Sequence, residues 1–223
     1  MLTTLGASAL TDFALAAETC FLAGLLFARP KTRYSAAWFW QWSMLLLAVS
    51  AFIGGLDHGF IQAAGDTPTR KVVQHSTWTV IGLSTCATFL TIVRQFVIDR
   101  RHRVLTAVAM AQFVVYVVLF LRFDTYAVVV ANYAPVMIWA LVANLRGLGD
   151  GTGHWPIIAS IGAGVTASVA QAAGWRLSAT FDHQSVYHLG MMVAVVFSYI
   201  GGLRLKGFTS RPPGRSAHLL YSP

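Results

Sequence analysis

Seven long runs of apolar residues follow one another along this chain, and short polar stretches separate them. A helix needs about 20 mainly apolar residues to cross the hydrocarbon core of a bilayer, and each run approaches that length. The runs predict spanning helices at residues 8–28, 36–61, 72–97, 103–121, 125–146, 155–174 and 184–205. Since 56% of the 223 residues are hydrophobic and only 11% are charged, a soluble domain could not bury so much apolar surface. We therefore expect an all-α integral membrane protein, a bundle of seven transmembrane helices.

The predicted helices form one domain, residues 1–206, with no soluble domain beside it. Residues 207–223 show no apolar periodicity, and the run Pro212, Pro213, Gly214 interrupts any regular element. This segment also carries Arg211 and Arg215, so we expect a disordered basic tail.

The basic residues predict the orientation of the bundle. Of the 16 Lys and Arg residues, all but Arg70, Lys71, Arg122 and Arg176 fall on the side that holds the C-terminus. Loops rich in Lys and Arg stay in the cytoplasm, so the N-terminus is expected outside and the C-terminus in the cytoplasm. Short loops and a short tail favour a bacterial inner membrane, with the opposite side periplasmic.

The formal charge of +8 could suggest nucleic acid as a partner, but the basic residues flank apolar segments. Anionic lipid head groups and topology account for them, so we expect membrane lipids and no nucleic acid. The two cysteines, Cys20 and Cys86, both fall inside predicted spans and form no CxxC pair. A disulfide framework and a zinc–thiolate site are therefore not expected.

Four histidines are predicted to lie at one depth near the outer side. His58 ends the second span, His75 lies about one turn into the third, and His183 and His188 open the seventh. At 1.5 Å of rise per residue, all four fall within roughly 10 Å of one level. Ionisable groups inside a bilayer are costly unless they face a cavity or each other, so the cluster predicts a metal site. On one regular helix His183 and His188 would point about 140° apart, so both can bind one ion only if His183 lies in an irregular first turn.

Two acids accompany these histidines. Asp57 precedes His58, and Asp182 precedes His183. Either carboxylate is a candidate catalytic base or a group that orients a histidine. Asp182 is equally suited to cap the first free N–H groups of the seventh helix.

Other polar residues fall inside the predicted spans or at their outer ends. Glu18 lies midway through the first span, where a carboxyl is either neutral or paired. It could partner a histidine, hold a structural cation or relay protons. The remaining candidates are Ser50, Gln184 and Tyr187, of which Gln184 shares a helix face with His188.

Seven spans with an external N-terminus, one histidine late in the second helix and a histidine pair opening the seventh resemble a known superfamily. These are the seven-helix membrane metal hydrolases that include alkaline ceramidases, adiponectin-receptor-like proteins and Per1-like proteins. The resemblance implies zinc ligation by His58, His183 and His188. The chain departs from that pattern, because His183 and His188 are five positions apart where the family has HxxxH. The family's SxxxH is also replaced, since the nearest serine, Ser50, lies two turns before His58.

Three functions are compatible with these residues. The first is a zinc-dependent hydrolase that acts on a lipid amide or ester at the outer leaflet, with a histidine-bound metal hydroxide as nucleophile. The second is a non-catalytic metal- or proton-binding site in a carrier, sensor or assembly subunit. The third is a haem protein with two axial histidines. A carrier should show a polar path that continues inward from Glu18.

Overall fold

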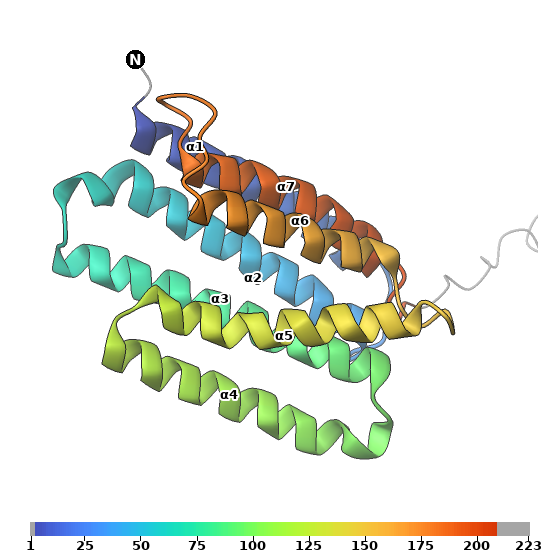
Figure 1. Cartoon of the computed structure of the whole chain (residues 1–223). Helices are drawn as coiled ribbons and strands as arrows, with labels where there is room; N and C mark the ends of the chain where they lie inside the picture. The colour runs from blue at the N-terminus through green and yellow to red at the C-terminus, as the bar shows by residue number, and fades with distance from the viewer. Residues whose placement is uncertain (1–2, 209–223) are drawn as a thin grey trace, which may run out of the picture.

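The computed structural model describes residues 3–208 and contains seven long helices (Figure 1). They are α1 (Thr4–Phe27), α2 (Ala36–Leu56), α3 (Pro68–Phe96), α4 (His102–Phe123), α5 (Tyr126–Gly147), α6 (Trp155–Ala172) and α7 (His183–Gly202). Three short turns complete the described part: η1 (Asp57–Ile61), η2 (Gln62–Ala64) and η3 (Asp99–Arg101). Most of the predicted tail, residues 209–223, lies outside the described residues.

Seven helices are long and apolar enough to cross a membrane, so the prediction of an all-α integral membrane bundle is confirmed. Hydroxyl and carboxylate side chains fix where several of them begin. Thr3, Ser35, Thr67 and Asp182 each accept a hydrogen bond from a backbone N–H in the first turn of the helix that follows. α3 starts earlier than predicted because Thr67 caps it and Pro68 occupies the first helical position, where a missing N–H costs nothing.

Consecutive helices run in opposite directions, and α1, α2, α6 and α7 lie together on one side of α3 (Figure 1). α2 packs between α1 and α3, α7 packs on both α1 and α6, and α4 lies at the opposite edge of the bundle. The bundle therefore has two ends. We call the end where α1, α3, α5 and α7 begin the Asp12 end. The opposite end, which carries most of the Lys and Arg residues, is the basic end.

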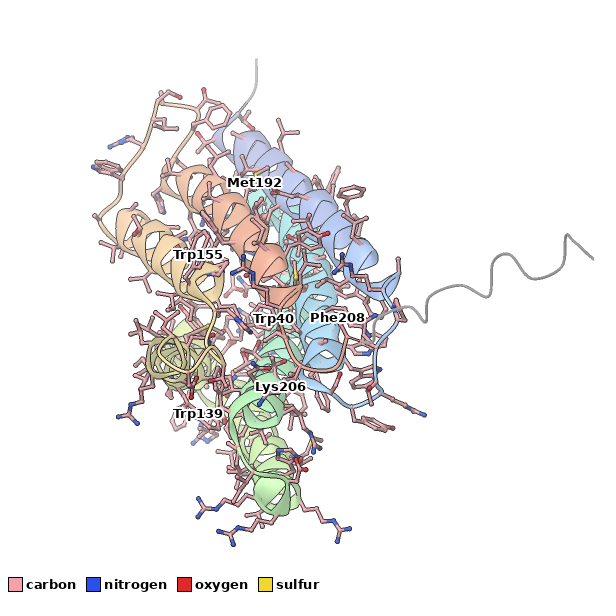
Figure 2. The ribbon with its side chains drawn as sticks, turned by 90° about the vertical axis from the view of Figure 1, so that its right-hand side faces the viewer. Trp40, Trp139, Trp155, Met192, Lys206 and Phe208 are labelled. Atoms are coloured by element: carbon pink, nitrogen blue, oxygen red, sulfur yellow. The ribbon has the colours of Figure 1, made fainter. Side chains whose placement is uncertain are left out.

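An apolar layer formed by α1, α2 and α7 lies about one turn beyond Asp12, toward the basic end. It consists of Leu15 and Ala16 of α1, Ala51 of α2 and Val195 of α7, all at most 8% exposed. Leu22, Leu47, Met191 and Met192 pack against these four residues; Met192 is labelled in Figure 2. Glu18 lies about two turns further along α1 than Asp12, on the other side of Leu15 and Ala16. Along α1, the layer thus lies between Asp12 and Glu18.

The chain after α7 packs against the α1–α2 connection at the basic end, where Figure 2 labels Lys206 and Phe208. Phe208 forms an isolated antiparallel bridge with Lys31, and the N–H of Thr32 donates to the carbonyl of Gly207 at 2.8 Å. The indole of Trp40 donates to the carbonyl of Ser198 at 3.0 Å. The bond of Trp40 joins the end of α7 to α2. The contacts of Gly207 and Phe208 join the following segment to the α1–α2 connection and extend two residues beyond the predicted domain boundary.

Candidate functional site

A buried carboxylate on α1 lies between two imidazoles at the Asp12 end. Asp12 is 4% exposed, and its Oδ2 lies 2.7 Å from Nδ1 of His58. Its Oδ1 lies 3.1 Å from Nε2 of His188. The centroids of the two imidazole rings are 6.1 Å apart. Three helical segments distant in sequence therefore supply one polar centre, which we call the Asp12 centre.

The local structure of each segment explains this meeting. On α1, Ser8, Asp12 and Leu15 recur at helical spacing and form one buried stripe toward the rest of the bundle. At the end of α2 the chain widens into the π-helical turn η1, a feature that often occurs at functional sites and that here carries His58. Gly54 lies one turn earlier, and a Cβ added there would be 3.5 Å from Oδ2 of Asp12. The backbone of α2 therefore approaches the carboxylate closely, and a Cβ at this position would be in ordinary van der Waals contact with it.

Thr11 orients His188 from the other side. Its Oγ1 lies 3.0 Å from Nδ1 of His188, and the same hydroxyl reaches the carbonyls of Ala7 and Ser8 at 3.1 and 2.9 Å. When the hydroxyl donates to a carbonyl, Nδ1–H donates to Thr11 and Nε2 faces a carboxylate, so a second proton or a cation must lie between them. When the hydroxyl donates to Nδ1 instead, Nε2–H donates to Asp12. Only the first arrangement requires an additional proton or a cation between His188 and Asp12.

Asp182, a predicted catalytic residue, caps α7. Its Oδ1 accepts from the backbone N–H of Ser185 at 3.0 Å and from the hydroxyls of Ser185 and Ser8, each at 3.2 Å. Burial raises the pKa of Asp182, but these hydrogen bonds outweigh that effect and leave the pKa below its ordinary value. The carboxylate is thus an ionised cap that ties α7 to α1.

Asp57, the other predicted catalytic residue, is buried and faces α3. Its Oδ1 lies 3.4 Å from Nε of Arg70, so the two side chains form an ion pair. Asp57 is adjacent to His58 in sequence, but this contact joins η1 to the start of α3.

The structure brings together two of the four predicted metal ligands, His58 and His188. His75 is paired elsewhere, with its Nε2 2.8 Å from Oδ1 of Asp124 in the α4–α5 connection. Its ring also packs on Trp78 and Phe120, with centroids 5.4 and 5.5 Å away. His183 is the first residue of α7 and is exposed. In the described part of the chain, no hydrogen bond or ion pair joins His75 or His183 to Asp12.

The remaining polar candidates lie around the centre or below it. Tyr187 contacts His188 edge-on, with ring centroids 5.5 Å apart, whereas Gln184 lies one turn before His188 on α7. Ser50 is buried and donates to the carbonyl of Leu47 at 2.8 Å. In residues 3–208, Oε2 of Glu18 is buried and has no hydrogen-bond partner.

The donor set of the Asp12 centre matches a catalytic metal site in its chemistry. Two imidazoles and one carboxylate are a ligand set that catalytic zinc uses, with a further position left for water. The contact between Thr11 and Nδ1 of His188 is the kind of second hydrogen bond that metal-binding histidines make. Within residues 3–208, no group of three His, Cys, Asp or Glu side chains is arranged so that it could hold a metal ion. Asp12 instead bridges the two imidazoles directly.

Asp12 was not among the candidate residues that the sequence indicated. The available signal was helical spacing, since Asp12 is one turn from Ser8 on the buried face of α1. Thr11 gave no such signal, because a hydroxyl inside an apolar helix usually bonds its own backbone.

A family model described as a family of unknown function, DUF6962, matches residues 7–207. This range includes all seven helices except the first turn of α1. No curated protein and no solved structure matches the chain.

Proposed function

The chain belongs to DUF6962, a family of unknown function, and we propose that it is a membrane-embedded hydrolase whose reacting centre is Asp12, His58 and His188. The observation that supports this most is the carboxylate of Asp12 between two imidazoles at 2.7 and 3.1 Å, near the ends of three spanning segments. Acids and histidines inside a bilayer are costly, and they mark functional sites when they face one another.

The proposed substrate is an amide or ester of a lipid in the leaflet at the Asp12 end. By the positive-inside rule this end faces outward. The side chain of His58 is 18% exposed, whereas that of Asp12 is 5% exposed, so His58 is the member of the centre that water or substrate reaches.

A divalent cation, with zinc expected, is the proposed cofactor. Asp12, His58 and His188 would hold it in place of the protons that join each imidazole to the carboxylate. When bound, the cation would lower the pKa of a water molecule and provide hydroxide near neutral pH. Thr11 would hold the ring of His188 in orientation. Asp57 and Asp182 are not proposed as bases, because Arg70 and the start of α7 engage them.

A second candidate function is a proton-binding centre without metal. It is favoured by the direct pairing of each Asp12 oxygen with one imidazole and by the absence of a three-ligand arrangement in residues 3–208. Such a centre would serve a sensor better than a carrier, since the apolar layer of Leu15, Ala16, Ala51 and Val195 lies between Asp12 and Glu18 along α1. A haem between His58 and His188 would require Asp12 to leave its place between them.

Elemental analysis of the purified full chain tests the metal, and hydrolysis of lipid amides and esters tests the reaction. We expect about one divalent ion per chain, lost in His58→Ala, His188→Ala and Asp12→Ala. His75→Ala is the matched control, because His75 pairs with Asp124, and it should keep the ion. If the metal-free protein hydrolyses lipids, the proposed enzymatic activity stands and the proposed metal cofactor is wrong. If neither metal nor hydrolysis is found, the second candidate function, the proton-binding centre, is the one supported. Loss of the ion in His75→Ala would contradict the ligand assignment.

A further inference from the structure

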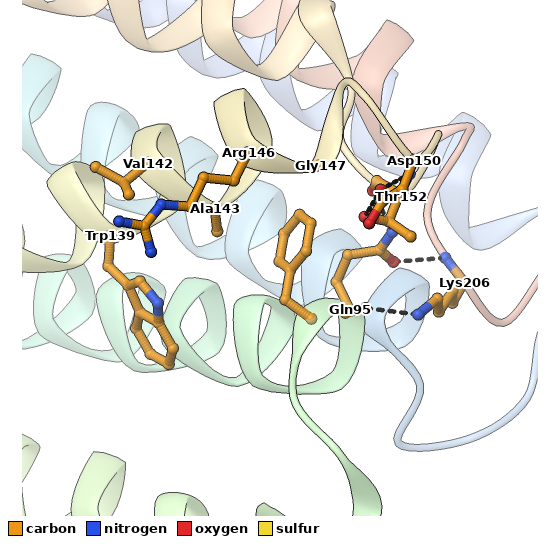
Figure 3. Close-up of a pocket in the computed structure, with 10 residues that line it drawn as sticks. Gln95, Trp139, Val142, Ala143, Arg146, Gly147, Asp150, Thr152 and Lys206 are labelled. Atoms are coloured by element: carbon orange, nitrogen blue, oxygen red, sulfur yellow. Dashed lines mark hydrogen bonds between the residues drawn. The ribbon is translucent and has the colours of Figure 1, made fainter.

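A second site lies at the basic end, far from the Asp12 centre. A pocket of about 380 Å³ opens between the ends of α3 and α5 and the segment after α7 (Figure 3). It combines an apolar part, which includes Phe96, Trp139 and Val142, with a polar part at Gln95 and Lys206. A surface pocket with both characters is suited to an amphiphilic ligand.

The polar part is built on a buried amide. Gln95 is 2% exposed; its Oε1 accepts from the backbone N–H of Lys206 at 2.9 Å, and its Nε2 donates to the carbonyl of Thr152 at 2.9 Å. The ammonium of Lys206 donates to the carbonyl of Gln95 at 2.7 Å, as the dashed lines of Figure 3 show. These bonds hold the side chain of Lys206 at the pocket, although Lys206 is an exposed residue.

The two cations of the pocket outnumber its one acid. Arg146, at the end of α5, is exposed, and in residues 3–208 it has no hydrogen-bond or ion-pair partner. In Figure 3 its guanidinium lies near Trp139, at the opposite end of the pocket from Lys206. The carboxylate of Asp150 is already occupied, since it accepts from the N–H and the hydroxyl of Thr152 at 3.0 and 2.6 Å. These hydrogen bonds lower the pKa of Asp150, so it stays ionised.

The apolar part of the pocket continues onto the lipid-facing side of α5. Val142 lines the pocket and is 37% exposed, and Ile138 and Leu145 on the same helix are 62% and 50% exposed. A ligand with its charged group at Arg146 could therefore extend acyl chains along α5 without entering water.

We propose that this pocket binds the head group of an anionic phospholipid from the leaflet at the basic end. The phosphate pairs with the guanidinium of Arg146, which offers a fork of N–H donors matched to phosphate oxygens. The remainder of the head group extends toward Lys206, and the acyl chains lie against Val142 and its lipid-facing neighbours. Basic pockets between helices on the cytoplasmic side suit acidic lipids, and a free phosphate would use only the cations.

Lipid-dependent thermal stability of the detergent-purified full chain tests the proposal. Phosphatidylglycerol should raise the midpoint of unfolding, whereas phosphatidylcholine with the same acyl chains and inorganic phosphate should not. Arg146→Ala should weaken the apparent affinity for phosphatidylglycerol by about tenfold or more, as expected for loss of a charge-assisted contact. Arg103→Ala is the control, because Arg103 is an exposed arginine at the same end and outside the pocket.

Three results would overturn the proposal: equal affinity in Arg146→Ala and Arg103→Ala, an equal shift with phosphatidylcholine, or a full shift with phosphate alone. If Arg146→Ala does not fold, Arg146→Gln keeps the aliphatic stem and removes the charge. Trp139→Ala gives an independent readout, since it should weaken lipid binding while both cations remain. Retention of full affinity in Trp139→Ala would exclude the apolar part of the site.

Discussion

The hydroxyl of Thr11 lies 3.0 Å from Nδ1 of His188, so a side chain on α1 sets the orientation of a ring on α7. Thr11→Val keeps the shape of the side chain and removes this hydrogen bond. Under the proposed metal-dependent function we expect a loss of about 10–100-fold in metal affinity or activity, which is what groups that orient a metal-binding histidine typically contribute. Titration of zinc into the metal-depleted protein measures it, and Thr11→Ser should restore binding. Unchanged affinity in Thr11→Val would show that the contact has no part in the centre.

Asp12 should also matter for the stability of the bundle. Asp12→Ala leaves His58 and His188 without their buried partner, which costs about 1–3 kcal/mol for an unsatisfied buried polar group. Thermal unfolding in detergent, followed by circular dichroism, measures the effect. Asp66→Ala removes an exposed acid near the same end and should change stability far less. Equal midpoints for the two variants would argue against the pairing seen here.

The two roles considered for Asp182 can be separated by a pair of substitutions. Asn is as good an N-cap as Asp, so Asp182→Asn should keep both stability and any metal-dependent turnover. Asp182→Ala removes the cap and should cost about 1 kcal/mol. Denaturation and turnover assays on both variants distinguish the roles. Loss of turnover in a stable Asp182→Asn protein would assign Asp182 a catalytic role and contradict the capping interpretation.

Acid should loosen the connection between α3 and the α4–α5 turn. The pKa of Asp124 lies below its ordinary value of 3.8, because His75 and then Lys71 donate hydrogen bonds to it. A group whose pKa is lowered by folding adds stability above the pKa of the unfolded chain and loses it as the pH falls through the folded pKa. Asp124→Asn should therefore be less stable than the parent at about pH 6, and the difference should shrink toward about pH 3. Asn tolerates the left-handed backbone of this residue (φ 46°), so the comparison reports the charge. A constant difference across this range would exclude an electrostatic contribution.

The sequence predicted the seven helices well because their apolar runs carry the signal of length directly. It also predicted the depth of His58 and His188, since rise per residue fixes depth. It could not predict rotation about each helix axis. The π-helical turn at Asp57 and the pairing of His75 with Asp124 both depend on tertiary packing. For that reason the four histidines predicted to form one cluster are divided in the structure: two lie at Asp12, one pairs with Asp124, and His183 is exposed.

The apolar layer formed by Leu15, Ala16, Ala51 and Val195 has an electrical consequence. A transmembrane voltage falls mainly across the region that excludes water, and this layer lies on the side of Asp12 that faces the middle of the bundle. Protons or cations that reach His58 enter and leave from one compartment only and cross little of that voltage. Whatever turnover the centre supports should therefore be non-electrogenic, and in sealed vesicles it should depend on the pH of the compartment at the Asp12 end and not on the voltage across the membrane.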